Sequence, residues 1–350
     1  MLTEKKQFIK IGVIGCGQWG INHVRNFSYL LGSKGIICAD LDKNRLETIR
    51  NTFINVKVTT DYKDIINDTQ IKAVCIATQS ASHYRLAKEC LEHEKDVLCE
   101  KPLCTTIEEA EKLIAIAQEK KCILMVGHVF IFHPGISKLK EYIINNELGK
   151  IQYAHSERTN LGPFRYDVDA VFDLAAHDVS IFNYLFSKTP IEVSARGHRC
   201  LTEERDDLAF ITLLYPNNIL VNIHVSWIDP KKVRTVTIVG DKKMAFWDDL
   251  SAEGAIKLYD KHVEQKTLYY ENFGEFQLLS KEGDITIPKI DLYEPLKEQD
   301  SHFIDCIENR KQPVSDGQTG LDVVKVLCAA EESIKRRGAS IEVTKNSRKK

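Results

Sequence analysis

The chain has 350 residues, which exceeds one ordinary domain and suits two. Hydrophobic residues make up 43% of it and charged residues 28%, as in most globular proteins. The 48 basic and 50 acidic side chains give a formal net charge of −2. Because so small a net charge produces no strong field, we exclude a protein that gathers nucleic acid or an anionic membrane surface.

The sequence also indicates where the protein works. No stretch approaches the roughly 20 apolar residues that are needed to cross a bilayer, and residues 1–6 do not resemble a signal peptide. Ten cysteines are scattered along the chain without a Cys-x-x-Cys motif, which is typical of reduced thiols in a core. We therefore expect a cytoplasmic protein without a metal site.

Residues 1–126 are predicted to form a Rossmann dinucleotide-binding domain of the α/β class. Short apolar runs predict strands at 8–14, 36–39, 56–58, 73–77, 96–99 and 122–126. Helical patterns lie between them at 19–31, from 61, at 80–92 and at 106–120. Strands and helices that alternate in this way form a doubly wound sheet with helices on both faces.

Residues 127–340 are predicted to form an α+β domain for substrate binding and oligomerisation, followed by a basic tail at 341–350. Helices are expected at 135–145, 170–186, 295–308 and 317–337, and strands at 151–157, 191–197, 208–214, 219–227, 233–239 and 243–247. Short polar links between strands predict a large open, mostly antiparallel sheet. Val221, Ile223 and Val225 alternate with polar residues, and few helices remain to cover both faces. We therefore expect a homodimer or homotetramer.

The loop Gly15-Cys16-Gly17-Gln18-Trp19-Gly20 fits G-x-G-x-x-G between an expected strand and helix. Such glycines allow a tight turn and the close approach of a pyrophosphate, and the helix start offers free N–H groups. Asp40 ends the next strand, where a carboxylate accepts hydrogen bonds from ribose hydroxyls. No Arg or Lys directly follows Asp40, which favours NAD. The alternative is a turn that binds no nucleotide.

Two further patterns are candidates for catalysis. Lys101 follows an expected buried strand, at the sheet edge where it could exchange a proton with a hydroxyl. Asp173 and His177 are spaced i, i+4, so the imidazole could act as the base while the carboxylate binds a neighbouring hydroxyl. The alternatives without a catalytic role are a solvated strand end at Lys101 and a helix-stabilising pair of Asp173 and His177.

Five ordered motifs resemble the Gfo/Idh/MocA family over nearly the whole chain. They are the glycine loop, Ala77-Thr78 with His83, Glu100-Lys101-Pro102, Gly127-His128-Val129-Phe130, and Asp173 with His177. The resemblance implies an NAD-dependent dehydrogenase that acts on a CH–OH group. It also implies a cofactor pocket lined by Thr78, His83, Glu100, Lys101 and His128, with Lys101, Asp173 and His177 facing the substrate.

A narrower resemblance is to UDP-N-acetylglucosamine 3-dehydrogenases, carried by residues 157–162, 167–178 and 294–296. It implies oxidation of the C3 hydroxyl with NAD and transfer of the 3-keto sugar to a PLP-dependent aminotransferase, for lipid A or surface glycans. Arg158, Asn160 and Arg165 are then expected to bind this nucleotide sugar, because arginine forks suit diphosphates. The alternatives are UDP-N-acetylglucosaminuronate, reduction of a keto-sugar nucleotide, a free sugar or inositol, or a regulatory protein that only binds NAD.

Overall fold

The computed structural model describes residues 9–252, 255–270 and 273–343, without the side chains of 264–280. The chain folds into two compact units. The first contains Met1–Phe132 and Glu294–Cys328, and the second contains His133–Tyr293 and Ala329–Lys350. The chain therefore returns to the first unit at Glu294, whereas the sequence pattern alone places this segment in the second domain. Most of the predicted basic tail, from residue 344, lies outside the described residues.

A six-stranded parallel sheet forms the centre of the first unit, in the order β3-β2-β1-β4-β5-β6. Its strands are β1 (Lys10–Ile14), β2 (Ile36–Ala39), β3 (Lys57–Thr59), β4 (Ile71–Ile76), β5 (Asp96–Glu100) and β6 (Leu124–Gly127). Nearly every residue of the central strands is buried, as in a sheet covered on both faces. This arrangement confirms the predicted Rossmann fold.

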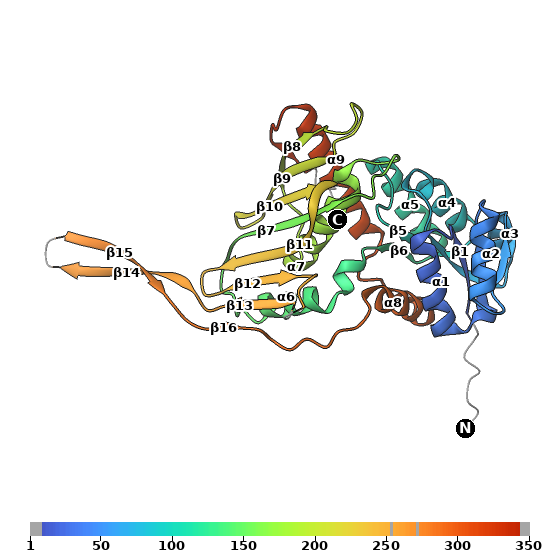
Figure 1. Cartoon of the computed structure of the whole chain (residues 1–350), viewed down its shortest axis with the longest axis horizontal. Coiled ribbons are helices and arrows are strands. Elements are labelled where there is room, and N and C mark those ends of the chain that lie inside the picture. The colour runs from blue at the N-terminus through green and yellow to red at the C-terminus, as the bar shows by residue number, and fades with distance from the viewer. Residues whose placement is uncertain (1–8, 253–254, 271–272, 344–350) are drawn as a thin grey trace, which may run out of the picture. The chain divides into compact units, whose positions relative to one another are not determined.

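The strand order reverses between β1 and β4, and this reversal determines on which face of the sheet the helices of the first unit lie. They are α1 (Gln18–Leu31), α2 (Lys43–Thr52), α3 (Lys63–Asn67), α4 (Ser80–Glu92), α5 (Ile107–Lys120), α8 (Pro295–Asn309) and the first part of α9 (Gly317–Lys335). Right-handed crossovers place α1 and α4 on opposite faces of the sheet. Helix α8 packs on α1, and α5 packs on α4 (Figure 1).

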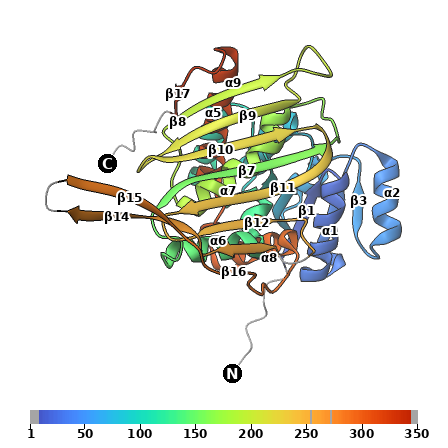
Figure 2. The same cartoon turned by 60° about the vertical axis from the view of Figure 1, so that its left-hand side comes forward.

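A nine-stranded sheet forms the second unit, in the order β16-β13-β12-β11-β7-β10-β9-β8-β17 (Figure 2). Within the described part of this sheet only β7 and β10 pair in parallel, which confirms a mostly antiparallel sheet. The strands are β7 (Ile151–Leu161), β8 (Glu192–His198), β9 (Leu208–Tyr215), β10 (Ile219–Ser226), β11 (Ile228–Gly240), β12 (Met244–Asp248), β13 (Ile256–Tyr259), β16 (Ile285–Thr286) and β17 (Ile341–Glu342).

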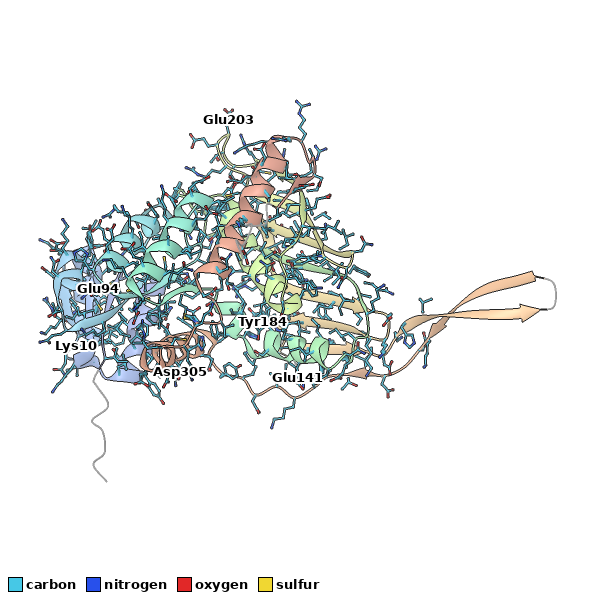
Figure 3. The ribbon with its side chains drawn as sticks, turned by 180° about the vertical axis from the view of Figure 1, so that it is seen from behind. Lys10, Glu94, Glu141, Tyr184, Glu203 and Asp305 are labelled. Carbon is cyan, nitrogen blue, oxygen red and sulfur yellow. The ribbon has the colours of Figure 1, made fainter. Side chains whose placement is uncertain are left out.

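The two faces of this sheet have different surroundings. Helices α6 (Pro134–Ile144) and α7 (Ala176–Phe186) cover one face, and Figure 3 shows Glu141 and Tyr184 on this helical layer in front of the strands. The hydroxyl of Tyr215 in β9 donates to Oδ1 of Asn183 in α7 at 2.7 Å. On the opposite face of the same strands, large apolar side chains are about half exposed, namely Tyr153 (45%), Phe210 (50%) and Leu220 (49%).

Several elements differ from those that the sequence predicts. Helix α2 and strands β13 and β16 have no counterpart among the predicted elements, nor does the hairpin of β14 (His262–Tyr270) and β15 (Phe273–Lys281). This hairpin projects beyond the end of the nine-stranded sheet (Figures 1 and 2). A π-helical turn over Val171–Ala175 precedes α7. None of the described helices combines the length and the apolar character that a membrane span requires.

Candidate active site

The glycine loop connects β1 to α1, and its shape requires glycine at two positions. Gly15 has a φ of +92°, in the left-handed region that side chains disfavour. At Gly20 an added Cβ would stand 1.8 Å from the carbonyl oxygen of Gly15. The start of α1 therefore packs directly against the loop, as a tight strand-to-helix turn requires.

The same loop has the features of a pyrophosphate site. The nearest atom to a Cβ added at Gly17 would be Nη1 of Arg45, at 3.6 Å, so the backbone is open there. Gly17 is also the N-cap of α1, and no described side chain caps this helix start. The first N–H groups of α1 can therefore bind an anion. The residues present fit NAD at this end.

Asp40 is held rigidly at the carboxyl end of β2. Its Oδ2 accepts from the backbone N–H of Cys16 at 2.6 Å, and its Oδ1 accepts from that of Asp42 at 2.8 Å. Each oxygen keeps a second lone pair with which it can accept from a ribose hydroxyl. Nη1 of Arg45 lies 3.5 Å from Oδ2, so a cation from α2 does neighbour Asp40, although none follows it directly in the sequence.

The ends of β5 and β6 bring together Glu100, Lys101 and His128. The backbone N–H of Lys101 donates to Oε2 of Glu100 at 3.2 Å, and both side chains are largely buried. His128 is 1% exposed, and neither ring nitrogen has a hydrogen-bond partner among the described residues. Burial lowers the pKa of His128 from 6.5 to about 4, against the charge of Glu100. His128 is therefore a buried, neutral imidazole beside Glu100 and Lys101.

His83 connects the loops that follow β4 and β5. Its Nδ1 lies 2.7 Å from the carbonyl oxygen of Pro102, and its Nε2 lies 3.1 Å from that of Thr78. The hydroxyl of Thr78 lies 2.7 Å from that of Ser82. The first unit thus gathers every predicted cofactor residue at the carboxyl ends of its parallel strands, or on the loops and helix starts that follow them, which is the edge where such sheets bind ligands.

In the second unit, Asp173 and His177 lie on consecutive turns. Asp173 belongs to the π-helical turn, a feature often found at functional sites, and His177 is the second residue of α7. Nε1 of Trp227 donates to Oδ2 of Asp173 at 3.1 Å, and Nη1 of Arg165 lies 3.3 Å from Oδ1. Arg165 also pairs with Asp167 at 2.7 Å. The Asp173 carboxylate is therefore fixed in orientation by two donors.

The other predicted substrate residues have partners within the second unit. Arg158 is 3% exposed and pairs with both oxygens of Asp178, at 2.7 and 3.3 Å. The side-chain amide of Asn160 donates to the carbonyl oxygen of Gly162. The substrate-binding roles of Arg158, Asn160 and Arg165 stay predictions. Among the described residues, no three His, Cys, Asp or Glu side chains are placed to hold a metal ion.

Two side chains that contact the candidate site residues are not predicted from the sequence. Trp227 reaches Asp173 from the segment after β10, and its position at the end of an apolar run is the one available signal. The carboxylate of Asp167 compensates the charge of Arg165. Because the two residues are only two positions apart, the sequence indicates no more than a local contact between them.

Comparison with known protein families identifies the family of this chain. A model described as "Oxidoreductase family, NAD-binding Rossmann fold" matches residues 9–128, and one described as "GFO/IDH/MocA C-terminal domain" matches residues 136–246. The chain belongs to the Gfo/Idh/MocA family. It is therefore an NAD-dependent oxidoreductase, and the glycine loop and Asp40 lie within its NAD-binding domain.

Similar proteins in this family include dehydrogenases of two kinds. An inositol 2-dehydrogenase 2 of Paenarthrobacter aurescens is 29% identical over 228 residues, covering 62% of this chain and 68% of that protein. The UDP-N-acetylglucosamine 3-dehydrogenase of Acidithiobacillus ferrooxidans is 26% identical over 244 residues, covering 69% and 72%. A solved structure of the latter enzyme, GnnA, has a TM-score of 0.77 at 21% identity and covers 94% of this chain and 98% of its own.

Proposed function

We propose that this enzyme oxidises a ring hydroxyl of a nucleotide-linked amino sugar, the C3 hydroxyl of UDP-N-acetylglucosamine. The observation that carries the proposal is the similarity to the UDP-N-acetylglucosamine 3-dehydrogenase of Acidithiobacillus ferrooxidans. The segments at 157–162 and 167–178, which resemble those of such enzymes, support it. The proposal includes a cytoplasmic location for the enzyme. The product, a 3-keto sugar, is a carbonyl compound that a PLP-dependent aminotransferase could convert to a 3-amino sugar.

Residues of the chain divide the chemistry between them. Bound NAD supplies the hydride acceptor. Either Lys101 or His177 removes the proton from the reacting hydroxyl, and a side chain in that role contributes roughly 10²–10⁴-fold to the rate. Asp173 accepts a hydrogen bond from a neighbouring hydroxyl, with its carboxylate oriented by Trp227 and Arg165.

A second candidate function is the oxidation of a neutral polyol or free sugar. Arg158 and Arg165 both pair with carboxylates inside the second unit, so their charges are already compensated. A neutral polyol needs no cation for binding, whereas a diphosphate would have to compete with Asp167 and Asp173 for Arg165. The similarity to inositol 2-dehydrogenases favours the same alternative.

We also propose that the enzyme is a homodimer or homotetramer, joined through the exposed face of the nine-stranded sheet. Tyr153 and Leu220 are register partners on β7 and β10, and Phe210 stacks on His224 nearby. These half-exposed apolar side chains form an apolar strip on one face of the sheet, interrupted by the polar pair of Asn222 and Thr212, and a second copy of the same sheet would cover it.

A comparison of substrates tests the proposed function. Purified enzyme with NAD is offered UDP-N-acetylglucosamine, UDP-N-acetylglucosaminuronate, N-acetylglucosamine and myo-inositol, and NADH formation is followed by absorbance. We expect kcat/KM for UDP-N-acetylglucosamine to exceed that for myo-inositol by at least about 100-fold. A preference for myo-inositol would establish the second candidate, and a preference for the uronic acid would replace the named sugar.

A further inference from the structure

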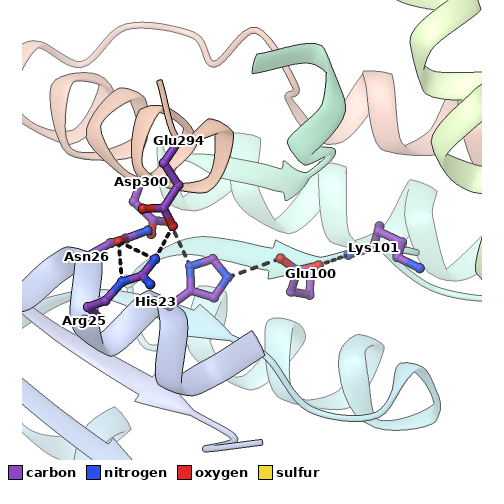
Figure 4. A network of polar contacts seen from close by, with 7 residues as sticks. All are labelled: His23, Arg25, Asn26, Glu100, Lys101, Glu294 and Asp300. Carbon is purple, nitrogen blue, oxygen red and sulfur yellow. Dashed lines mark hydrogen bonds and ion pairs between the residues drawn. The ribbon is translucent and has the colours of Figure 1, made fainter. Parts of the chain in front are cut away.

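A buried histidine connects three elements of the first unit (Figure 4). His23 of α1 has no exposed surface. Its Nδ1 lies 2.8 Å from Oδ1 of Asp300 in α8, and its Nε2 lies 3.2 Å from Oε1 of Glu100 in β5. Asn26, one turn later in α1, donates to Oδ2 of Asp300 at 3.1 Å. The imidazole therefore bridges two buried carboxylates.

The electrostatics of this bridge favour a protonated imidazole, which alone can donate to both carboxylates. Burial lowers the pKa of His23, but Asp300, and then Cys75 in β4, raise it well above 6.5. Burial raises the pKa of Glu100, but His23 and then Lys101 lower it below its ordinary value. Burial raises the pKa of Asp300, against the lowering effect of His23 and Asn26.

Glu100 transmits this bridge to the backbone of Lys101. Its Oε1 faces His23, and its Oε2 accepts from the backbone N–H of Lys101. Each oxygen of the carboxylate thus has its own partner. Without His23, Oε1 of this buried carboxylate would lose its imidazole partner, and among the described residues only the backbone N–H of Lys101, at Oε2, would still orient it.

We propose that His23 is a positioning residue for Lys101: by bridging Asp300 and Glu100, it fixes the carboxylate that holds the Lys101 amide. This inference rests on the proposed catalytic role of Lys101. It gives α8, which comes almost at the end of the chain, a part in fixing the carboxyl edge of the Rossmann sheet. His23 itself keeps its proton and does not contact the substrate.

Hydrogen exchange of the Lys101 amide tests the proposal directly. The variants are His23→Gln and Asp300→Asn, and the matched control is Lys297→Ala, which removes the contact of Lys297 in α8 with the ring of Tyr29 in α1, between the same two helices but outside the bridge. We expect the amide to exchange at least about tenfold faster in both test variants, and at the wild-type rate in the control. Wild-type protection in both test variants, or equal loss in the control, would overturn the proposal.

Turnover and cofactor binding complete the test. In either folded variant we expect kcat to fall by roughly 10–100-fold, while the NADH dissociation constant, read from the change in NADH fluorescence on binding, changes by less than about threefold. The double variant should lose no more than the worse single variant, because both act on one bridge. Wild-type kcat in a variant with fast amide exchange would also contradict the positioning role. If the wild type turns over none of the substrates, the proposed function fails, and the amide exchange still decides the bridge.

Discussion

In each unit, hydrogen-bond donors hold a particular carboxylate in one orientation. Asp173 is oriented by Trp227 and Arg165, and Glu100 is oriented by His23 and the Lys101 amide. Fixed carboxylates of this kind suit a site that must hold hydroxyls and a proton acceptor in one geometry, because little reorganisation is left for the reaction itself.

Replacement of the proposed proton acceptors should separate chemistry from binding. We expect Lys101→Met and His177→Asn each to lower kcat by roughly 10²–10⁴-fold. NADH affinity, measured by fluorescence titration, should stay within about fivefold of wild type, since the glycine loop and Asp40 are untouched. Parallel loss of turnover and NADH binding would indicate that the residue supports the fold.

The neutral state of His128 should be visible in the pH dependence of stability. Its folded pKa of about 4 lies below the unfolded value near 6.5, so the folded state binds fewer protons. Stability is therefore lost as the pH falls from 6.5 towards 4, by about 2.5 kcal/mol at pH about 4.5. Urea unfolding at neutral and acidic pH should show this extra loss in wild type and not in His128→Gln. An equal loss in both proteins would show that His128 is not held neutral by burial.

At the scale of elements, segments with a regular pattern of buried side chains are predicted best. The sequence predicts the bounds of Ile36–Ala39 and Ser80–Glu92 as the structure has them. Helix α2 is not predicted because Leu46 and Ile49 are its only buried residues and most others are charged or polar. The parallel pairing of β7 with β10 is not predicted from the sequence either, since a local pattern does not encode which strands become neighbours.

The candidate site is predictable only in part for the same reason. The glycine loop, Asp40 and Lys101 follow strands directly, and parallel strands bring their carboxyl ends to one edge. His23 and Asp300 are 277 residues apart, so neither residue alone carries a signal of their contact. The return of the chain to the first unit at Glu294, which brings Asp300 there, is likewise absent from the local pattern.

Two glycines of the loop should respond differently to the same substitution. Gly20→Ala places a Cβ 1.8 Å from a backbone oxygen, so we expect the free energy of unfolding to fall by about 1–3 kcal/mol or more. Gly17→Ala meets only Arg45 at 3.6 Å, so stability should change little. NADH affinity should nevertheless fall at least about tenfold, because the pyrophosphate approaches there. Unchanged NADH binding in Gly17→Ala would contradict the cofactor site.

At the scale of the whole molecule, the exposed sheet face should determine assembly. We expect Phe210→Glu to raise the dissociation constant of the oligomer at least about 100-fold, because it places a charge in the apolar strip. Leu201→Glu, which alters a similarly exposed side chain on a loop outside the sheet, is the control. Light scattering after gel filtration measures both. A wild type that is monomeric, or a Phe210→Glu variant that assembles normally, would exclude this interface.

The fate of the hydrogen on the reacting carbon tests hydride transfer from the sugar most directly. UDP-N-acetylglucosamine carrying deuterium at C3 is incubated with enzyme and NAD, and the reduced cofactor is analysed by mass spectrometry. We predict reduced cofactor that carries the deuterium in its nicotinamide ring, formed at least about 100-fold more slowly by the Lys101→Met variant. Reduced cofactor without deuterium would mean that another carbon is oxidised, and no reduction at all would contradict oxidation of this sugar.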